Sequence, residues 1–469
     1  MMQKWNFQLR GFFFLAFLFT LTIGCGGSTD TPNSKQDITL PDDNSDGNDN
    51  GNDNSGEDSG DNQEQAVDIS CGPTSLGWTD PTDYMTWSLQ IPREKHTYQI
   101  GDPEMSFDTS KIDPLYKDQM EKWMTAGRIG GIPHIETLIP DKILEAGTTS
   151  IDINRAIAAL EKTGGVIMLK DGIHPINGTI NLKSNVIIIG ESRKGTCCLI
   201  GSNMYQKSAF FFDSIKNAGM YRMTIKGDYE SKFGGHSPHY LWNVSDQVGN
   251  DELNLEANDK EGMSTVRFYH SQNCWLDDMN ILNSADFAIN CFGKHTTLRN
   301  LHIEGSYTKC GGGRGYFYIG YPYNLITGCE VTHLRHISIQ SVSSEYNVLI
   351  NNALKQEVSF HTKDNGNNLI MGNNITLPTD MPGTDLPNYY AIMGPWSIIH
   401  ILSYHPNFIY KNHCLEQNKG HNNAKPWSDD SKLYKGPKSI KPANPWINFL
   451  PVSDEETPIH DTLYPVILD

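Results

Sequence analysis

The sequence ISIQ at residues 337–340 returns as VSFH at 358–361, and NVLINN at 347–352 returns as NLIMGN at 368–373. Both pairs are separated by 21 residues. Short alternating segments that recur about every twenty residues between Asn and Gly turns are typical of a solenoid in which each coil stacks on the previous one. The repeat therefore predicts a mostly β chain. It also predicts which side chains lie next to each other on neighbouring coils.

The start of the repeating region has a distinctive order of elements. Asp152 opens an amphipathic helix over 153–162, a glycine pair closes it, and short strands follow at 166–169, 179–182 and 185–190. With the turn at 170–172, this order resembles the opening of pectate-lyase-like right-handed parallel β-helices. The resemblance spans roughly residues 150–415 and implies an all-β, single-stranded right-handed parallel β-helix with an N-terminal capping helix. It implies no single activity, because this fold includes lyases, hydrolases, transferases and phage adhesins.

Composition divides the chain into five parts. Residues 1–24 carry Lys4, Arg10 and an apolar run over 12–23, as a secretory signal peptide does. The segment 21–25 resembles a bacterial lipobox, which implies that Cys25 is lipidated and tethers the exported protein to a bacterial membrane, expected to be the outer membrane. The other parts are a disordered acidic linker at 25–68, an N-terminal extension or cap at 69–148, the β-helix at 149–415 and a C-terminal cap at 416–469.

The acidity of the chain is concentrated in the linker. The formal net charge is −18, and residues 26–68 hold 12 acidic residues against one lysine. Such a segment has too little to bury to form a core. The remaining body is only moderately acidic, which argues against nucleic acid as a partner. We expect a monomer whose partners are an acidic polysaccharide and, through the lipid, a membrane.

Alternation within the repeat assigns side chains to the inside and the outside of the solenoid. Apolar residues at alternate positions point inward: Ile337, Ile339, Val358 and Phe360. Outward residues on neighbouring coils then form two rows. The first row is predicted to contain Asp286, Tyr316, His336 and Glu357. The second is predicted to contain Asn290, Gly320, Gln340 and His361.

These rows and the adjoining turns hold the groups that β-elimination from a uronic acid requires. Arg314 or Arg335 could bind the substrate carboxylate. Neutralising its charge makes the proton on the neighbouring carbon more acidic. An imidazole could remove that proton, because it titrates near neutral pH, and a phenol could protonate the leaving oxygen. We predict a catalytic group of His361, His336, Tyr316 and Arg335. Further substrate contacts are predicted from Arg314, Gln340, Glu357, Lys363, Asp364, Asn290, Tyr318 and Trp396.

Three alternatives stay open. A glycoside hydrolase needs two carboxylates about 5–10 Å apart; in the predicted register Asp286 and Glu357 are about 14 Å apart, whereas Glu357 and Asp364 are closer if the turn folds back. A non-catalytic glycan-binding solenoid would use the tyrosines at 316, 318, 321 and 323. The rows could also be polar only because this face is exposed to solvent. His336 and Glu357 would then form a surface ion pair that contributes less than about 1 kcal/mol to stability.

Calcium is the one cofactor that the resemblance suggests. Some pectate-lyase-like enzymes use Ca²⁺ to neutralise the uronate, and Asp277 and Asp278 offer carboxylates. Neighbouring residues on a strand point to opposite faces, so this pair alone is a poor chelator. The sequence leaves the metal requirement open.

Overall fold

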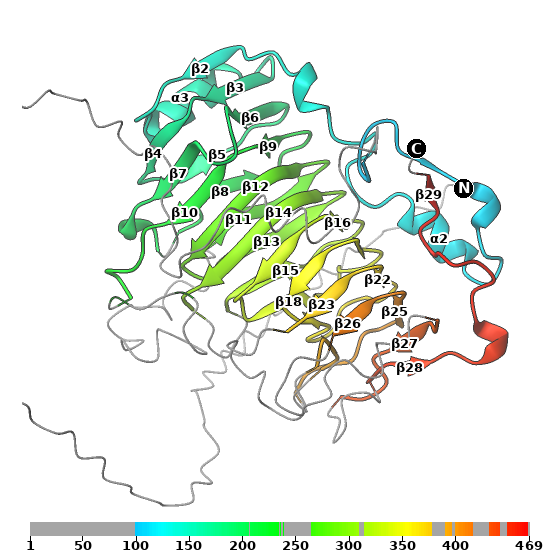
Figure 1. The fold of residues 1–469 in the computed structure, drawn as a ribbon. Coiled ribbons are helices and arrows are strands. Elements are labelled where there is room, and N and C mark those ends of the chain that lie inside the picture. The colour runs from blue at the N-terminus through cyan, green and yellow to red at the C-terminus, as the bar shows by residue number, and fades with distance from the viewer. Residues whose placement is uncertain are drawn as a thin grey trace, which may run out of the picture. The chain divides into compact units, whose positions relative to one another are not determined.

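The computed structural model describes residues 99–205, 207–233, 235, 238, 264–308, 314–377, 390–395, 399–415, 431–440 and 448–467. All of them belong to one compact unit, Ala66–Asp469. The signal peptide, the linker, Cys25 and Trp396 lie outside the described residues. Within the unit the chain winds into a parallel β-helix with three faces (Figure 1). The predicted fold is confirmed, and its hand is the right-handed one that parallel crossovers strongly favour.

Each coil contributes one strand to each face. Face I contains β2 (Lys142–Leu144), β3 (Gly165–Leu169), β6 (Val186–Gly190), β9 (Gly219–Tyr221), β16 (Leu325–Thr327), β19 (Val348–Ile350), β22 (Leu369–Met371) and β25 (Asn407–Tyr410). Face II contains β4 (Gly172–Ile176), β7 (Thr196–Ile200), β10 (Thr224–Gly227), β17 (Glu330–Thr332), β20 (Ala353–Lys355), β23 (Asn374–Thr376) and β26 (His413–Leu415). Two long strands run through both faces, β12 (Trp275–Ser284) and β14 (Thr297–Ser306).

Face III forms a separate sheet. Its strands, in order along the solenoid, are β5 (Ile180–Asn181), β8 (Phe210–Asp213), β11 (Ser264–Gln272), β13 (Phe287–Lys294), β15 (Tyr316–Ile319), β18 (His336–Ile339), β21 (Val358–Ser359) and β24 (Ile392–Met393). All neighbouring pairs are parallel. Side chains that point outward from this sheet therefore stand in rows about 4.8 Å apart from strand to strand.

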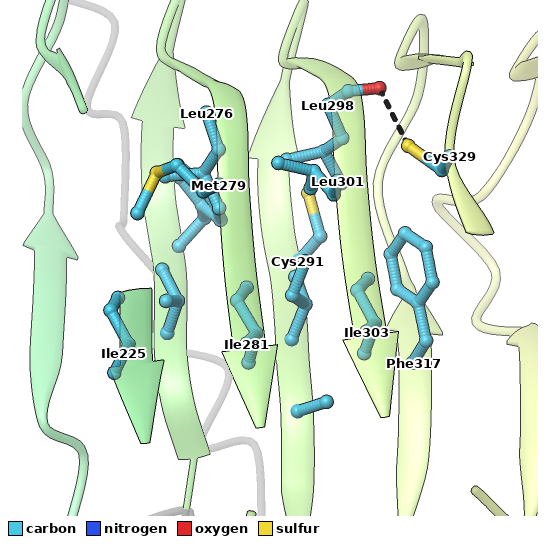
Figure 2. Packing of buried hydrophobic residues seen from close by; sticks show 14 of the residues in the cluster. Ile225, Leu276, Met279, Ile281, Cys291, Leu298, Leu301, Ile303, Phe317 and Cys329 are labelled. Carbon is cyan, nitrogen blue, oxygen red and sulfur yellow. Dashed lines mark hydrogen bonds between the residues drawn. The ribbon is translucent and has the colours of Figure 1, made fainter. Parts of the chain in front are cut away.

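The inward side chains build a continuous core. The four predicted inward residues, Ile337, Ile339, Val358 and Phe360, are fully buried. Figure 2 shows the packing in the middle coils, where Ile225, Ile281 and Ile303 line up on successive strands. Cys291 and Cys329 lie among them as free thiols, and burial raises the pKa of the Cys329 thiol to about 12. These cysteines pack as small apolar residues.

Two ladders of buried asparagines hold the turns between coils. In each ladder the side-chain oxygen of one asparagine accepts a hydrogen bond from the main-chain nitrogen of its counterpart one coil earlier. The first ladder runs through Asn324, Asn347, Asn368 and Asn407, and the second through Asn352, Asn373 and Asn412. Buried backbone groups need such partners. The repeated asparagines therefore fix the register of the coils.

Helix α3 (Ser150–Ala159) packs its buried residues Ile153, Ala156 and Ile157 into the core beside β4 and β5. Its start was predicted too late: Thr149 is the N-cap, and Asp152 completes a capping box inside the first turn. The short 3-10 turns are at Thr109–Lys111, Ile135–Thr137, Ser202–Met204 and Asp454–Glu456.

The two ends of the described chain pack together on face I. Strand β1 (Ser106–Phe107) pairs antiparallel with β29 (Val466–Ile467), next to α2 (Lys117–Trp123) (Figure 1). Trp123 of α2 lies edge-on to Phe408 of β25, with ring centroids 5.1 Å apart. Strand β27 (Tyr434–Gly436) pairs antiparallel with β25, and β28 (Leu450–Pro451) pairs antiparallel with β27. The described part of the N-terminal segment therefore extends along the solenoid. No helix among the described residues is long and apolar enough to cross a membrane.

Candidate active site

The strands of face III bring Tyr316, His336 and Glu357 into one outward row. Strands β15 and β18 pair with Tyr316 opposite His336. Ile337 pairs with Val358 on β21, which places Glu357 beside His336. The register predicted for these coils is confirmed. The three side chains are almost inaccessible, with exposed fractions of 0%, 6% and 0%.

The predicted register is wrong for the preceding coil, which contains β13. Asn290 of β13 pairs with Tyr318, not with Gly320, so Asp286 is not opposite Tyr316. A shift of two residues keeps every inward side chain inward, because the side-chain period of a strand is two. Alternation alone could not distinguish the two registers. Asn290 is buried next to Tyr318 and stands outside the row of Gln340 and His361.

His336 and Glu357 form a buried dyad. The Nδ1 atom of His336 is hydrogen-bonded to Oε1 of Glu357, and the side-chain amide of Gln356 donates to Oε2. With Glu357 ionised, the carboxylate only accepts, which places the proton on Nδ1 and leaves a lone pair on Nε2. Burial lowers the pKa of His336 well below its ordinary value, and the charge of Arg335 lowers it further. The imidazole is therefore neutral at neutral pH.

A second buried histidine, on face II, shows the contrast. Both ring nitrogens of His302 contact carboxylates, Nε2 with Glu304 at 2.7 Å and Nδ1 with Glu330 at 3.3 Å. Burial alone would lower the pKa of His302, but the two carboxylates raise it above its ordinary value. Lys355 also contacts Glu330, at 2.8 Å. His302 is a charged structural group with both nitrogens engaged, whereas His336 keeps one nitrogen available as a base.

Tyr316 is the phenol beside this dyad. Its ring centroid is 5.1 Å from that of His336, and the guanidinium carbon of Arg335 is 5.7 Å from the Tyr316 ring. Burial raises the pKa of Tyr316 against the opposing charge of Arg335, so the phenol keeps its proton at neutral pH. Within the described residues its hydroxyl has no hydrogen-bond partner of ordinary geometry. A ligand that reached this hydroxyl would meet a donor that is not already committed to another acceptor.

His361 completes a cluster of three rings. Its centroid is 5.6 Å from that of His336 and 6.0 Å from that of Tyr316. The ring of His400 lies 4.3 Å from that of His361 and is tilted by 50° against it. Burial lowers the pKa of His361 well below its ordinary value, and the neighbouring His336 and His400 lower it further. His336, His361, Tyr316 and Arg335 are called the catalytic cluster below.

Arg314 lies just before strand β15, which begins at Tyr316. Its Nη1 is 3.3 Å from Oδ2 of Asp286, and the main-chain nitrogen of Gly315 donates to Oδ1 of the same carboxylate. Both side chains are buried. Asp286 therefore orients the turn that carries Arg314.

The remaining predicted contacts differ in their placement. Gln340 is half-buried and hydrogen-bonds Tyr318, which opposes the rise that burial causes in the pKa of Tyr318. Lys363 is exposed in the turn after His361. Asp364 is wholly buried and accepts hydrogen bonds from Ser403, Asn368 and Asn407. Asp364 thus supports an asparagine ladder.

Aromatic side chains extend the outward surface toward the N-terminal coils. Phe292 stacks on Tyr318 with centroids 5.0 Å apart and meets Tyr321 edge-on at 5.7 Å. The guanidinium of Arg267 lies 5.4 Å from the Phe211 ring and 5.0 Å from the Tyr269 ring. The set formed by Phe211, Arg267, Tyr269, Phe292, Tyr318 and Tyr321 is called the aromatic strip. It shares face III with the catalytic cluster and meets it at β15.

Gly320 permits the central stack of the aromatic strip. A Cβ atom at this position would lie 2.5 Å from Tyr318 and 2.9 Å from Phe292. Real side chains do not approach so closely, so any larger residue would push the two rings apart. The absence of a side chain leaves the rings a shared, half-buried surface.

The carboxylates considered for calcium have other partners in the described part of the chain. The described residues contain no group of three or more His, Cys, Asp or Glu side chains that could hold an ion. Asp277 is held by Arg299 at 2.6 Å and Asp278 by Arg193 at 2.9 Å. The carboxylates considered for calcium are therefore each paired with a cation and face different partners.

Sequence reasoning missed two members of the site. Gln356, which orients Glu357, looked like an ordinary polar residue before the strand. His400 lies in a coil interrupted by a long insertion, but the asparagine ladders give its position. Asn368 and Asn407 are 39 residues apart and one coil apart, and the same step leads from His361 to His400.

No protein-family model and no curated protein sequence matches this chain. Among solved structures, a hyperthermoactive exopolygalacturonase from Thermotoga maritima is 16% identical over 60% of this chain and 72% of its own, with a TM-score of 0.36. A pectin methylesterase from Erwinia chrysanthemi is 11% identical over 69% of this chain and 88% of its own, with a TM-score of 0.28. At these values the likeness concerns the fold alone, so function has to be inferred from the side chains of face III.

Proposed function

We propose that this protein is a polysaccharide lyase that cleaves an acidic polysaccharide by β-elimination at a uronic acid. One observation carries the proposal: a buried neutral imidazole with a carboxylate partner stands 5.1 Å from a buried protonated phenol. A guanidinium lies beside that phenol. Elimination needs a base, an acid and positive charge at the substrate carboxylate. The catalytic cluster supplies all three.

His336 is the proposed base. With its Nδ1 proton directed to Glu357, Nε2 is the atom that accepts the proton next to the substrate carboxylate. The imidazolium that forms is stabilised by Glu357, as in other histidine–carboxylate pairs. His361, whose ring centroid is 5.6 Å from that of His336, is the second imidazole that could act as the base.

Tyr316 is the proposed acid, and Arg335 binds the uronate carboxylate. A uronate is an anion whose neighbouring proton becomes acidic only when its charge is neutralised, and a guanidinium can bind it through two hydrogen bonds. Tyr316 then protonates the glycosidic oxygen as the carbon–oxygen bond breaks. Arg314, paired with Asp286, is the residue proposed to bind a neighbouring acidic group of the polymer.

The aromatic strip supports a polymer as the substrate. Sugar rings present apolar C–H faces that pack on aromatic side chains, while their hydroxyls need polar partners. Phe292 and Tyr318 offer a stacked pair of rings next to the catalytic cluster, and Arg267 offers a cation two strands further on. A chain of several sugars that crosses the strands of face III contacts both regions.

Hydrolysis fits the described side chains less well. A hydrolase needs one carboxylate as acid and a second as base or nucleophile. Glu357 is bonded to His336 and Gln356, Asp286 is bonded to Arg314 and Gly315, and Asp364 is wholly buried. Each candidate carboxylate is already the partner of another group.

A panel of pectic, alginate, ulvan-type and sulfated galactan polymers tests the proposal. The purified protein is incubated with each, and ultraviolet absorbance of unsaturated uronates is recorded together with a reducing-end assay. A lyase raises both signals. New reducing ends without ultraviolet absorbance would indicate a hydrolase instead. If neither signal rises and the protein still binds the polymer, the protein is a glycan-binding solenoid.

A leaving group that needs no proton separates the roles of the two rings. On a uronate with fluoride as the leaving group, we expect Tyr316→Phe to regain most of its lost rate and His336→Asn to remain inactive. Tyr323→Phe is the matched control, since Tyr323 stacks between His295 and Tyr346 away from face III. Equal rescue of both variants would contradict the assignment of acid and base.

We further propose that the protein is exported and anchored to a bacterial membrane through a lipid on Cys25. The basic residues, apolar run and lipobox-like segment at the N-terminus support this. A surface anchor with a long acidic linker suits an enzyme that acts on an extended polymer.

A further inference from the structure

The acid and the base of the catalytic cluster approach a bound sugar from the same side. Tyr316 and His336 are register partners on adjacent parallel strands, and both project outward from face III. His361 follows the next strand of the same sheet, β21, by two residues. The choice between the two imidazoles as base does not alter this geometry, because Tyr316 lies 5.1 Å from one and 6.0 Å from the other.

The stereochemistry of an elimination decides how far apart its acid and base must be. When the proton and the leaving oxygen are on opposite sides of the sugar ring, the two catalytic atoms must flank the ring. Two hydrogen-bonding approaches of about 3 Å and the ring between them put those atoms about 7 Å apart, on opposite faces. When both leave from the same side, neighbouring side chains on one sheet can serve.

We infer that the enzyme performs syn elimination and is specific for uronates whose acidic proton and leaving oxygen lie on the same side of the ring. This inference rests on the proposed lyase function. D-Mannuronate and D-glucuronate meet the condition. Their epimers L-guluronate and D-galacturonate, in which the proton and the oxygen are trans-diaxial, do not.

The reaction balances with the groups present. Nε2 of His336 takes the proton next to the carboxylate, and the electron pair of that C–H bond becomes the new carbon–carbon double bond. The carbon–oxygen bond breaks, and the leaving oxygen takes the hydroxyl proton of Tyr316. The imidazolium then returns its proton to the neighbouring phenolate, which restores both groups without another reactant.

Two pairs of epimeric polymers test the inference: polymannuronate against polyguluronate, and polyglucuronate against polygalacturonate. Each pair differs at a single stereocentre, so charge and polymer length can be matched. We expect unsaturated product from polymannuronate or polyglucuronate to form at least about 100-fold faster than from its epimer, a ratio that a misplaced reacting group can produce.

The outcomes separate this inference from the proposed function. Unsaturated product that forms faster from polyguluronate or polygalacturonate would overturn syn elimination while keeping the lyase. Failure to form unsaturated product from all four polymers would overturn this inference, and the proposed function falls with it only if the ulvan-type polymer also yields no unsaturated product. Tyr316→Phe provides a second measurement on the preferred polymer: we expect kcat to fall about 100-fold with KM nearly unchanged, because a proton donor acts in the transition state. An unchanged kcat would overturn the inference.

Discussion

Glu357 accepts a hydrogen bond from Nδ1 of His336, its neighbour one coil earlier on face III. The pair is buried, and Gln356 holds the second carboxylate oxygen. This single relationship sets the tautomer of His336 and directs its remaining lone pair outward.

Replacing Glu357 by Gln tests the dyad. Glutamine keeps the shape of the side chain but cannot stabilise an imidazolium, so we expect kcat to fall about 10²–10⁴-fold with a much smaller change in KM. Steady-state kinetics on the preferred polymer gives both values. Glu161→Gln, at an exposed ion pair with Lys183, is the matched control. A Glu357→Gln enzyme with nearly normal kcat would contradict the role of the dyad.

The pH profile should reflect three buried side chains with displaced pKa values. Burial lowers the pKa of His336 and His361 well below the ordinary value of 6.5, and burial raises that of Tyr316 above its ordinary value of 10.0. The imidazoles are active when neutral and the phenol when protonated. We therefore expect kcat/KM to stay constant across neutral pH and to decline only well below pH 6.5, as the base gains a proton. A decline centred between pH 6 and 7 would show a solvent-exposed histidine instead.

Shortening Phe292 to alanine tests the aromatic strip. Loss of the stack on Tyr318 removes a sugar platform, so we expect KM for a long polymer to rise about tenfold, equivalent to about 1.4 kcal/mol, with kcat nearly unchanged. The same variant on a short oligosaccharide that occupies only the catalytic cluster serves as the internal control. Equal effects on long and short substrates would mean that Phe292 supports the fold and not the binding of the polymer.

Asp364 is expected to affect stability, with a definite dependence on pH. Burial raises its pKa to about 6, against hydrogen bonds from Ser403 and Asn407, compared with 3.8 when unperturbed. The folded state therefore holds this proton more tightly than the unfolded state, and the stabilisation from it is lost as pH rises through about 6. The full effect is about 3 kcal/mol at most.

Denaturant unfolding at pH 4.5 and pH 8 measures this effect. In Asp364→Asn the side chain no longer titrates, so the wild type should lose stability relative to the variant between these two pH values. Subtracting the values for the two proteins cancels the contributions of the other buried titratable groups, including His336 and His361, whose lowered pKa values act in the opposite direction. A difference that does not change with pH would contradict the raised pKa, and a large rise in KM without loss of stability would restore Asp364 as a substrate contact.

Lipidation of Cys25 is tested by Cys25→Ser in a bacterial host that processes lipoproteins. We expect the wild type to incorporate labelled palmitate and to sediment with membranes, and the variant to do neither. Cys71→Ser is the control. Membrane association that persists in Cys25→Ser would assign the anchor to another part of the chain.

The fold and half of the site could be predicted because the coils from 316 to 361 have nearly equal length. The repeated asparagines mark the turns, and counting from them places Tyr316, His336 and Glu357 in one row. The method failed at Asp286 and Asn290, where a longer coil intervenes and a shift of two residues preserves the alternation. It also overlooked His400, because an insertion separates that coil from its neighbours.

By itself, the sequence determined the solenoid, its repeat and the outward direction of the critical side chains, since these depend on local periodicity and on apolar residues that must be buried. Only the tertiary structure decided the chemistry of those side chains. A histidine beside a glutamate is either a charged pair, like His302 with Glu304 and Glu330, or a neutral base, like His336 with Glu357. The difference comes from how many carboxylates contact the ring and how completely water is excluded, and both depend on residues from several coils and turns packed together.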